Sequence, residues 1–83
     1  MTVRINPNPF TGRVLASIRL SKPQILTISV ADITGRLVKT YSANFSIGES
    51  QVEMNMESKP AGMYFIKVAG KENSVTTKLV KIR

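Results

Sequence analysis

The feature that most constrains this chain is a series of short segments in which apolar and polar residues alternate, each ended by Gly, Pro, Asn or Ser. A period of two puts successive side chains on opposite faces of a β-strand, whereas an amphipathic helix needs a longer period, near 3.6 residues. Seven such segments lie within 83 residues, so the sequence predicts seven strands and needs no helix. The predicted strands span residues 2–6, 14–20, 25–31, 36–45, 51–56, 63–68 and 75–82.

The phase of the alternation predicts a fold of two layers around one core. Strands with one apolar and one polar face bury the apolar side by packing two sheets together. We therefore expect an all-β domain, an immunoglobulin-like β-sandwich of about seven antiparallel strands in two sheets. The residues expected to face inward are Val14, Ala16, Ile18 and Leu20, then Leu26, Ile28 and Val30, then Val52, Met54 and Met56, and finally Tyr64, Ile66 and Val68.

Two stretches depart from the simple pattern. In the fourth predicted strand, Leu37, Val38 and Tyr41 break the alternation. This leaves open which of Leu37 and Val38 faces inward, and it allows a β-bulge. Residues 46–50, Ser-Ile-Gly-Glu-Ser, have the composition of a loop.

Length and composition limit the chain to one small domain without disulfides. A chain of 83 residues has room for a single core, so residues 1–83 are expected to form one domain. It contains neither Cys nor His, which removes the usual ligands of zinc as well. No apolar stretch approaches the roughly 20 residues of a membrane-spanning helix, so we predict no transmembrane segment. The net charge of +7 suits an acidic partner, an anionic surface or nucleic acid.

The sequence lacks the residue sets that catalysis and cofactor binding require. Nucleophilic hydrolysis needs a general base, most often His, beside the nucleophile. The acids are scattered at spacings that indicate neither a catalytic pair nor a calcium loop, and they are Asp32, Glu49, Glu53, Glu57 and Glu72. All five glycines are isolated, so none forms a phosphate-binding loop. We predict no catalytic residue, no cofactor site and no metal site, in a protein that is not an enzyme.

Turn residues are concentrated in short motifs between the strands. Asp-Ile-Thr-Gly at 32–35 fits a type I turn followed by a left-handed glycine, with Asp32 hydrogen-bonding its own backbone. Asn-Pro-Asn-Pro-Phe at 6–10 and Pro-Ala-Gly at 60–62 are further breaks. The motif residues expected to determine the fold are Pro7, Asn8, Pro9, Phe10, Asp32, Gly35, Pro60, Gly62 and Tyr64.

In their order and spacing these motifs resemble the type A sorting domain of proteins secreted by the type IX system of Bacteroidetes. The residues that carry the resemblance are Pro7, Asn8, Pro9 and Phe10, then Asp32, Gly35 and Arg36, then Pro60, Ala61, Gly62 and Tyr64, and finally Lys78, Lys81 and Arg83. The resemblance covers essentially the whole chain. Asn6 and Ala31 stand at positions where that family often has an aromatic residue.

The resemblance implies that the chain is a C-terminal secretion signal and a fragment of a larger secreted precursor. An upstream N-terminal signal would bring the precursor to the periplasm, and the cargo, joined in cis, would then reach the cell surface or the exterior. The implied partners are outer-membrane translocon components and a sortase-like cysteine protease that cleaves upstream of residue 7. The candidate contacts to an acidic receptor surface are Arg36, Lys78, Lys81 and Arg83.

Other functions remain open from the sequence. An immunoglobulin-like or fibronectin-like accessory module could help a surface enzyme to bind carbohydrate or protein, although the chain has no Trp to form a sugar platform. A nucleic-acid binder needs cations on one face and exposed aromatics, whereas here Lys and Arg are spread over most predicted strands, so we expect no nucleic-acid partner. Pairing of two copies through open sheet edges also stays open.

Overall fold

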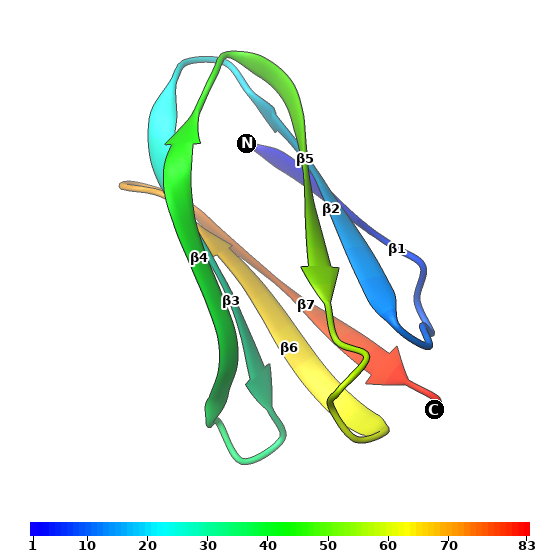
Figure 1. Ribbon diagram of the computed structural model, residues 1–83. Coiled ribbons are helices and arrows are strands. Elements are labelled where there is room, and N and C mark those ends of the chain that lie inside the picture. The colour runs from blue at the N-terminus through cyan, green and yellow to red at the C-terminus, as the bar shows by residue number, and fades with distance from the viewer.

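The computed structural model describes residues 1–83 and consists of strands and their connections, with no helix. The strands are β1 (Thr2–Asn6), β2 (Arg13–Leu20), β3 (Gln24–Asp32), β4 (Leu37–Phe45), β5 (Gly48–Asn55), β6 (Gly62–Ala69) and β7 (Ser74–Lys81). They form a three-stranded sheet in the order β1-β2-β5 and a four-stranded sheet in the order β4-β3-β6-β7 (Figure 1). The predicted all-β sandwich of seven strands is confirmed. No helix is present that is long and apolar enough to cross a membrane.

Connections between the sheets give the sandwich its topology. The chain passes from one sheet to the other after β2, after β4 and after β5. As a result β2 pairs with β5, and β3 pairs with β6, across long sequence separations. All strand pairs are antiparallel. Such Greek-key connections are typical of immunoglobulin-like sandwiches.

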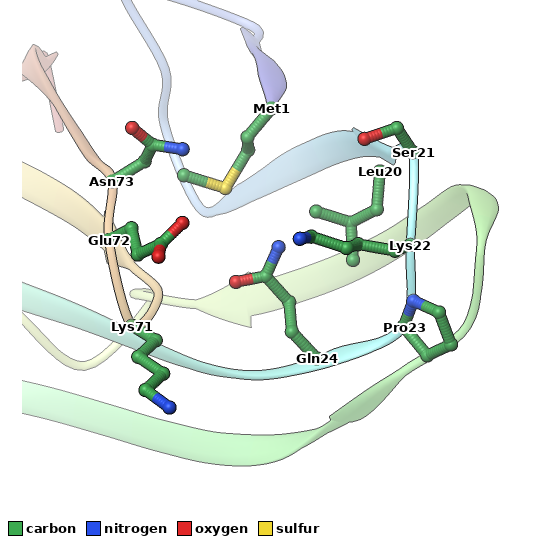
Figure 2. A pocket seen from close by; sticks show the side chains of 9 residues that line it. All are labelled: Met1, Leu20, Ser21, Lys22, Pro23, Gln24, Lys71, Glu72 and Asn73. Atoms are coloured by element: carbon green, nitrogen blue, oxygen red, sulfur yellow. The ribbon is translucent and has the colours of Figure 1, made fainter.

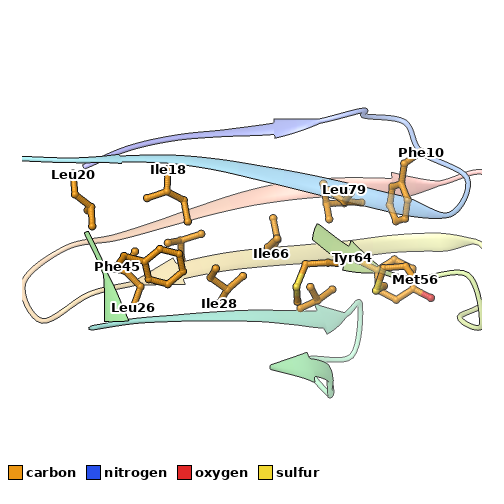
Figure 3. Close-up of a cluster of buried hydrophobic side chains, with 14 residues drawn as sticks. Phe10, Ile18, Leu20, Leu26, Ile28, Phe45, Met56, Tyr64, Ile66 and Leu79 are labelled. Atoms are coloured by element: carbon orange, nitrogen blue, oxygen red, sulfur yellow. The ribbon is translucent and has the colours of Figure 1, made fainter. Parts of the chain in front are cut away.

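The core lies between the two sheets and is formed mainly by the alternating residues (Figure 3). The expected inward-facing residues of β2, β3 and β6 are all buried, as are Met54 and Met56, and Val52 packs partly buried against them. Each fully buried aliphatic side chain contributes about 1.5–3 kcal/mol through removal of apolar surface from water. The predicted faces of these strands are therefore confirmed. Phe10 joins the core from outside the strands, at 1% exposure.

The fourth strand contains the bulge that its broken alternation allowed. Val30 pairs with Lys39, but the next residue, Ala31, pairs with Leu37, so that Val38 is the extra residue. Leu37 is 61% exposed and shares the outer face with Ala31, whereas Val38 packs partly buried against the core. The sequence left open which of Leu37 and Val38 faces inward. The register of the β3–β4 ladder shows that it is Val38.

The expected loop at residues 46–50 is only partly correct. β5 begins at Gly48, and residues 48–50 pair with the last three residues of β2, which end at Leu20. The prediction of a loop there was wrong because it used local composition. Strand pairing in this segment is determined by the length of its neighbour, and β2 offers ladder partners as far as Leu20.

Candidate functional site

The sequence motifs, far apart along the chain, meet at one end of the sandwich. Phe10 forms a parallel bridge with Lys81, which also pairs with Gly62 of β6. Tyr64 pairs with Asp32 at the end of β3. We call this region the motif end, and it comprises residues 7–12, 32–36, 55–62 and 78–83. The N-terminus lies at the other end, so the two chain termini are at opposite ends of the domain (Figure 1).

The opening motif lies along the end of β7, where the Asn8 side chain forms the hydrogen bonds that the backbone of a neighbouring strand would form. The Asn8 side-chain amide donates from Nδ2 to the Lys78 carbonyl at 2.9 Å, and its Oδ1 accepts from the Val80 N–H at 3.1 Å. Phe10 continues the ladder, because its N–H donates to the Val80 carbonyl and its own carbonyl accepts from Ile82, both at 2.9 Å.

The side chain of Asn8 forms these hydrogen bonds because the residues on either side of it have no backbone N–H to donate. Pro7 and Pro9 have no N–H to contribute to a ladder. The peptide bonds that precede both prolines are cis. The outer edge of β7, which would otherwise be open over its last residues, is thus occupied by the motif at 7–10.

The Asp32 motif forms the tight β3–β4 hairpin that the sequence predicts. Asp32 Oδ1 accepts from the Thr34 hydroxyl at 2.6 Å, from the Thr34 N–H at 2.9 Å and from the Arg36 N–H at 3.1 Å. The Gly35 N–H donates to the Asp32 carbonyl at 2.9 Å, and Gly35 has a φ of 91°, which side chains with a Cβ rarely adopt. These bonds confirm Asp32 as a turn residue.

Its hydrogen bonds also keep the Asp32 carboxylate ionised. The pKa of Asp32 lies below its usual value, chiefly because the Thr34 hydroxyl donates to the carboxylate, although partial desolvation opposes this effect. The backbone N–H groups of Thr34 and Arg36 and the positive charge of Arg36, whose Nε lies 3.4 Å from Oδ2, also lower the pKa. A carboxylate with a lowered pKa and several donors is a weak base, so this arrangement suits a turn and not proton transfer.

The third motif ties the entry of β6 to the turn before it. The Tyr64 ring is buried at 3% exposure, and its hydroxyl donates to the Pro60 carbonyl four residues earlier. This contact resembles the tyrosine corner of immunoglobulin-like domains, in which a buried Tyr fixes the chain just upstream. Gly62 opens β6 with a φ of 149°. The spacing of Pro60 and Tyr64 therefore has a direct structural role.

The four basic residues proposed as contacts all lie at the motif end, but they do not share one face. The Arg36 side chain is 79% exposed on the hairpin, and Lys78 and Arg83 are also exposed. Lys81 differs, since it points inward beside Leu79 and is 4% exposed. No buried side-chain nitrogen or oxygen lacks a partner, and Lys81 forms no side-chain hydrogen bond or ion pair, so its ammonium reaches water.

Comparison with known protein families identifies the kind of domain that carries these motifs. A family model described as secretion system C-terminal sorting domain matches residues 4–82, which includes every residue of the motif end except Arg83. The chain belongs to this family. A search of curated proteins gave no match. The sorting domain is the C-terminal sorting signal for type IX secretion, and the alternative of an accessory binding module is not favoured.

Membership of this family also implies how the protein is exported. It implies a type IX secretion system, a cargo joined in cis, and export to the cell surface or outside the cell. The family is not known as catalytic. No group of three His, Cys, Asp or Glu side chains gathers in the structure where it could hold a metal ion.

The largest hollow of the sorting domain lies away from the motif end and has a volume of about 350 Å³. It is bounded by the β2–β3 and β6–β7 loops, and Figure 2 shows Met1, Gln24 and Glu72 pointing toward one another across it. Ser21 is its one hydroxyl and Glu72 its one carboxylate, and neither side chain forms a hydrogen bond. The lining therefore brings together no nucleophile and base.

Sequence reasoning missed two polar residues of the motif end. The Thr34 hydroxyl holds the Asp32 carboxylate, and Asn55 Oδ1 accepts from the Glu57 N–H at 3.0 Å. Both contacts join residues two positions apart, which is the spacing of Asx-type turns. The patterns Asp-x-Thr and Asn-x-Glu would have been the available signals.

Proposed function

We propose that the motif end is the part of the sorting domain that outer-membrane translocon components bind during export, after the precursor has reached the periplasm. The observation that carries this proposal is that the family motifs gather at the end farthest from Met1. A cargo joined in cis ahead of the domain continues from the Met1 end. The motif end therefore stays free to dock while the cargo is attached.

Rigidity and charge support binding at this end. Turns whose backbone is already fixed by side-chain hydrogen bonds lose little conformational freedom on docking, which favours affinity. The cations of Arg36, Lys78 and Arg83 and the water-accessible ammonium of Lys81 suit an acidic receptor surface. Charge of this kind raises the rate of encounter more than the final affinity.

The domain is proposed to act as a signal only, without activity of its own. A sortase-like cysteine protease would remove it at the cell surface by cleavage upstream of residue 7, and the cargo would stay at the surface or leave the cell. The chain offers no Cys or His for nucleophilic chemistry, which supports this division of roles. A site upstream of residue 7 also spares the ladder between Asn8 and β7.

A reporter fusion tests the proposal. Residues 1–83 are fused behind a signal peptide and a fluorescent protein and expressed in a Bacteroidetes strain with a type IX system. We expect the reporter at the cell surface or in the medium, and retention in the periplasm would refute the proposal. Deletion of residues 78–83 is a poor variant, because it removes buried Leu79 and the ladder partners of Asn8.

Charge reversal is the better variant, because exposed side chains are changed. Arg36→Glu/Lys78→Glu should lower export while the domain still melts cooperatively. Lys22→Glu/Lys71→Glu, at the other end, introduces the same change in net charge and should not. Equal loss of export in both variants would assign the effect to net charge and not to the motif end.

A further inference from the structure

The outer face of the four-stranded sheet is divided into two halves of different chemistry. Near the motif end its outward-facing strand residues other than Lys78 are apolar, and cross-strand pairs join Leu37 to Ala31, Ala31 to Phe65, and Met63 to Val80. The other half carries hydroxyl groups instead, from Thr27, Ser29, Thr40, Ser42, Ser74 and Thr76. We call the apolar half the apolar patch, and it consists of Ala31, Leu37, Met63, Phe65 and Val80.

These apolar side chains are open to solvent. Leu37 is 61% exposed, Met63 37% and Phe65 36%, and Ala31 and Val80 beside them are partly exposed. The outward face of an antiparallel sheet that meets water is usually polar. Single exposed apolar residues are common on proteins, but contiguous ones bordered by polar residues mark interaction sites.

Apart from Asp32, which is paired with Arg36, the charges around the apolar patch are positive. Lys78 lies directly opposite Phe65 on the neighbouring strand, and Arg36 immediately precedes Leu37. Lys67 is the only other charged residue among the outward-facing strand residues of this sheet, which include no carboxylate.

The three-stranded sheet has a different outer face. There Arg19 pairs across the ladder with Glu49, and Arg13 lies 3.6 Å from Glu53 in an ion pair. On that face Arg13 and Arg19 thus lie beside acids, whereas Arg4 pairs with Ser17 and has no acidic partner. Around the apolar patch only Arg36 has an acidic neighbour, Asp32, and the lysines have none.

We propose that the apolar patch is a docking surface for a protein partner that presents an apolar centre bordered by carboxylates. This inference rests on the proposed function and names the surface and the chemistry through which the translocon would bind the domain. Aromatic, Met and Arg side chains are enriched at the centres of protein interfaces, and here Phe65, Met63 and Arg36 lie together. Carboxylates on the partner would meet Lys78, which has no acid beside it, and the exposed Arg36 guanidinium, which is paired with Asp32.

Charge argues against a second copy of the chain as the occupant. Each copy carries a net charge of +7, and two apolar patches facing each other would bring Lys78 and Arg36 of one copy near the same cations of the other. No carboxylate of this face would offset that repulsion. An acidic partner removes the same cost and adds attraction.

The test replaces two apolar side chains by Thr, which suits exposed strand positions. In the reporter fusion, Leu37→Thr/Phe65→Thr should reduce export at least about tenfold, since loss of central interface residues is large in its effect on binding. Ile25→Thr is the matched control, because Ile25 is 63% exposed on the same sheet face but outside the apolar patch. It should be exported within about twofold of wild type. Cooperative melting of both purified variants establishes that they fold.

The outcomes separate the two proposals. If the wild-type fusion stays in the periplasm, the proposed function fails. If it is exported and Leu37→Thr/Phe65→Thr is exported equally well, only the docking surface is overturned. Purified wild-type fusion should be monomeric by sedimentation and should not bind phosphatidylglycerol vesicles. A dimer, or vesicle binding, that the double substitution abolishes would assign the apolar patch to a second copy or to a membrane and overturn the proposal.

Discussion

The two ends of the sandwich are stabilised in different ways. Of the eight hydrogen bonds that involve side chains, seven lie at the motif end, and the exception joins Thr27 to Ser42 within the four-stranded sheet. At the other end, the loops at 21–23, 46–47 and 70–73 have no side-chain hydrogen bond. The β6–β7 loop there is closed by a backbone bond from Gly70 to Asn73 at 2.7 Å.

The difference shows what the family motifs encode. Side-chain bonds to backbone groups fix a turn only when a particular residue stands at a particular position. Asn8, Asp32 and Tyr64 are such residues, and each is part of a motif. The loops of the other end depend on glycine instead, since Gly48 has a φ of 97° and a Cβ at Gly70 would clash with the Gln24 side chain. The motifs therefore specify the shape of one end of the domain through side-chain hydrogen bonds, which the loops of the other end lack.

The largest expected effect comes from two phenylalanines, one from each end. Phe10→Ala at the motif end and Phe45→Ala at the other end each remove a buried ring, at 1% and 8% exposure, and each should cost about 3–5 kcal/mol of the free energy of unfolding. Urea denaturation measures this loss. A domain of this size has little more than that in total, so both variants should be partly unfolded at 37 °C.

Hydrogen exchange then distinguishes the two ends. The Phe10 carbonyl accepts from the Ile82 N–H, and Asn8, two residues before Phe10, accepts from the Val80 N–H. In Phe10→Ala these two amides should exchange faster than the global loss of stability explains, whereas in Phe45→Ala they should follow it. Equal behaviour in both variants would show that the motif end does not open as a separate unit.

A smaller effect is expected for two asparagines. Asn8→Ala removes two hydrogen bonds and leaves a carbonyl and an N–H of β7 without their partner, which should cost about 1–2 kcal/mol. Asn73→Ala, in a loop of the other end, removes a side chain that forms no hydrogen bond and should change stability by less than about 0.5 kcal/mol. Both values come from thermal or urea unfolding. A loss in Asn73→Ala as large as in Asn8→Ala would remove the contrast between the ends.

Local patterns were sufficient to predict most of the strands. Alternation identified the inward faces of β2, β3 and β6 because each strand buries one side only, and Asp32 was predictable because its bonds reach at most four residues along the chain. The start of β5 at Gly48 was not, since its pairing depends on a partner nearly 30 residues away.

Three features at or near the motif end were not predicted from the sequence, two of them because they depend on residues far apart in the chain. The Asn8 contact joins residues 70 and 72 positions apart, so no local pattern indicates it. Lys81 was expected at the surface because it is charged, although the alternation of β7 places it on the inward side after Leu79. The apolar patch combines residues of four strands and becomes visible only when their register is known.

The smallest expected effect is a pH dependence that arises at the motif end. Because the folded domain lowers the pKa of Asp32, the ionised carboxylate stabilises the fold. This contribution is complete above the pKa of an unfolded Asp, about 3.9, and is lost as the pH falls through the lower value of the folded state. The melting temperature of Asp32→Asn should therefore lie below that of wild type at about pH 7, and the gap should narrow at about pH 2.

A second variant tests whether the Thr34 hydroxyl causes the pH dependence that Asp32 brings to stability. The Thr34 hydroxyl is the main reason for the lowered pKa, so Thr34→Val should shift the pH at which stability is lost toward that of an ordinary carboxyl group. The bonds from the backbone N–H groups of Thr34 and Arg36 remain in this variant, and part of the pH dependence should remain with them. If the gap between wild type and Asp32→Asn stays constant at every pH, the hairpin does not depend on the charge of Asp32. Its turn would then be specified by hydrogen-bond geometry and not by charge.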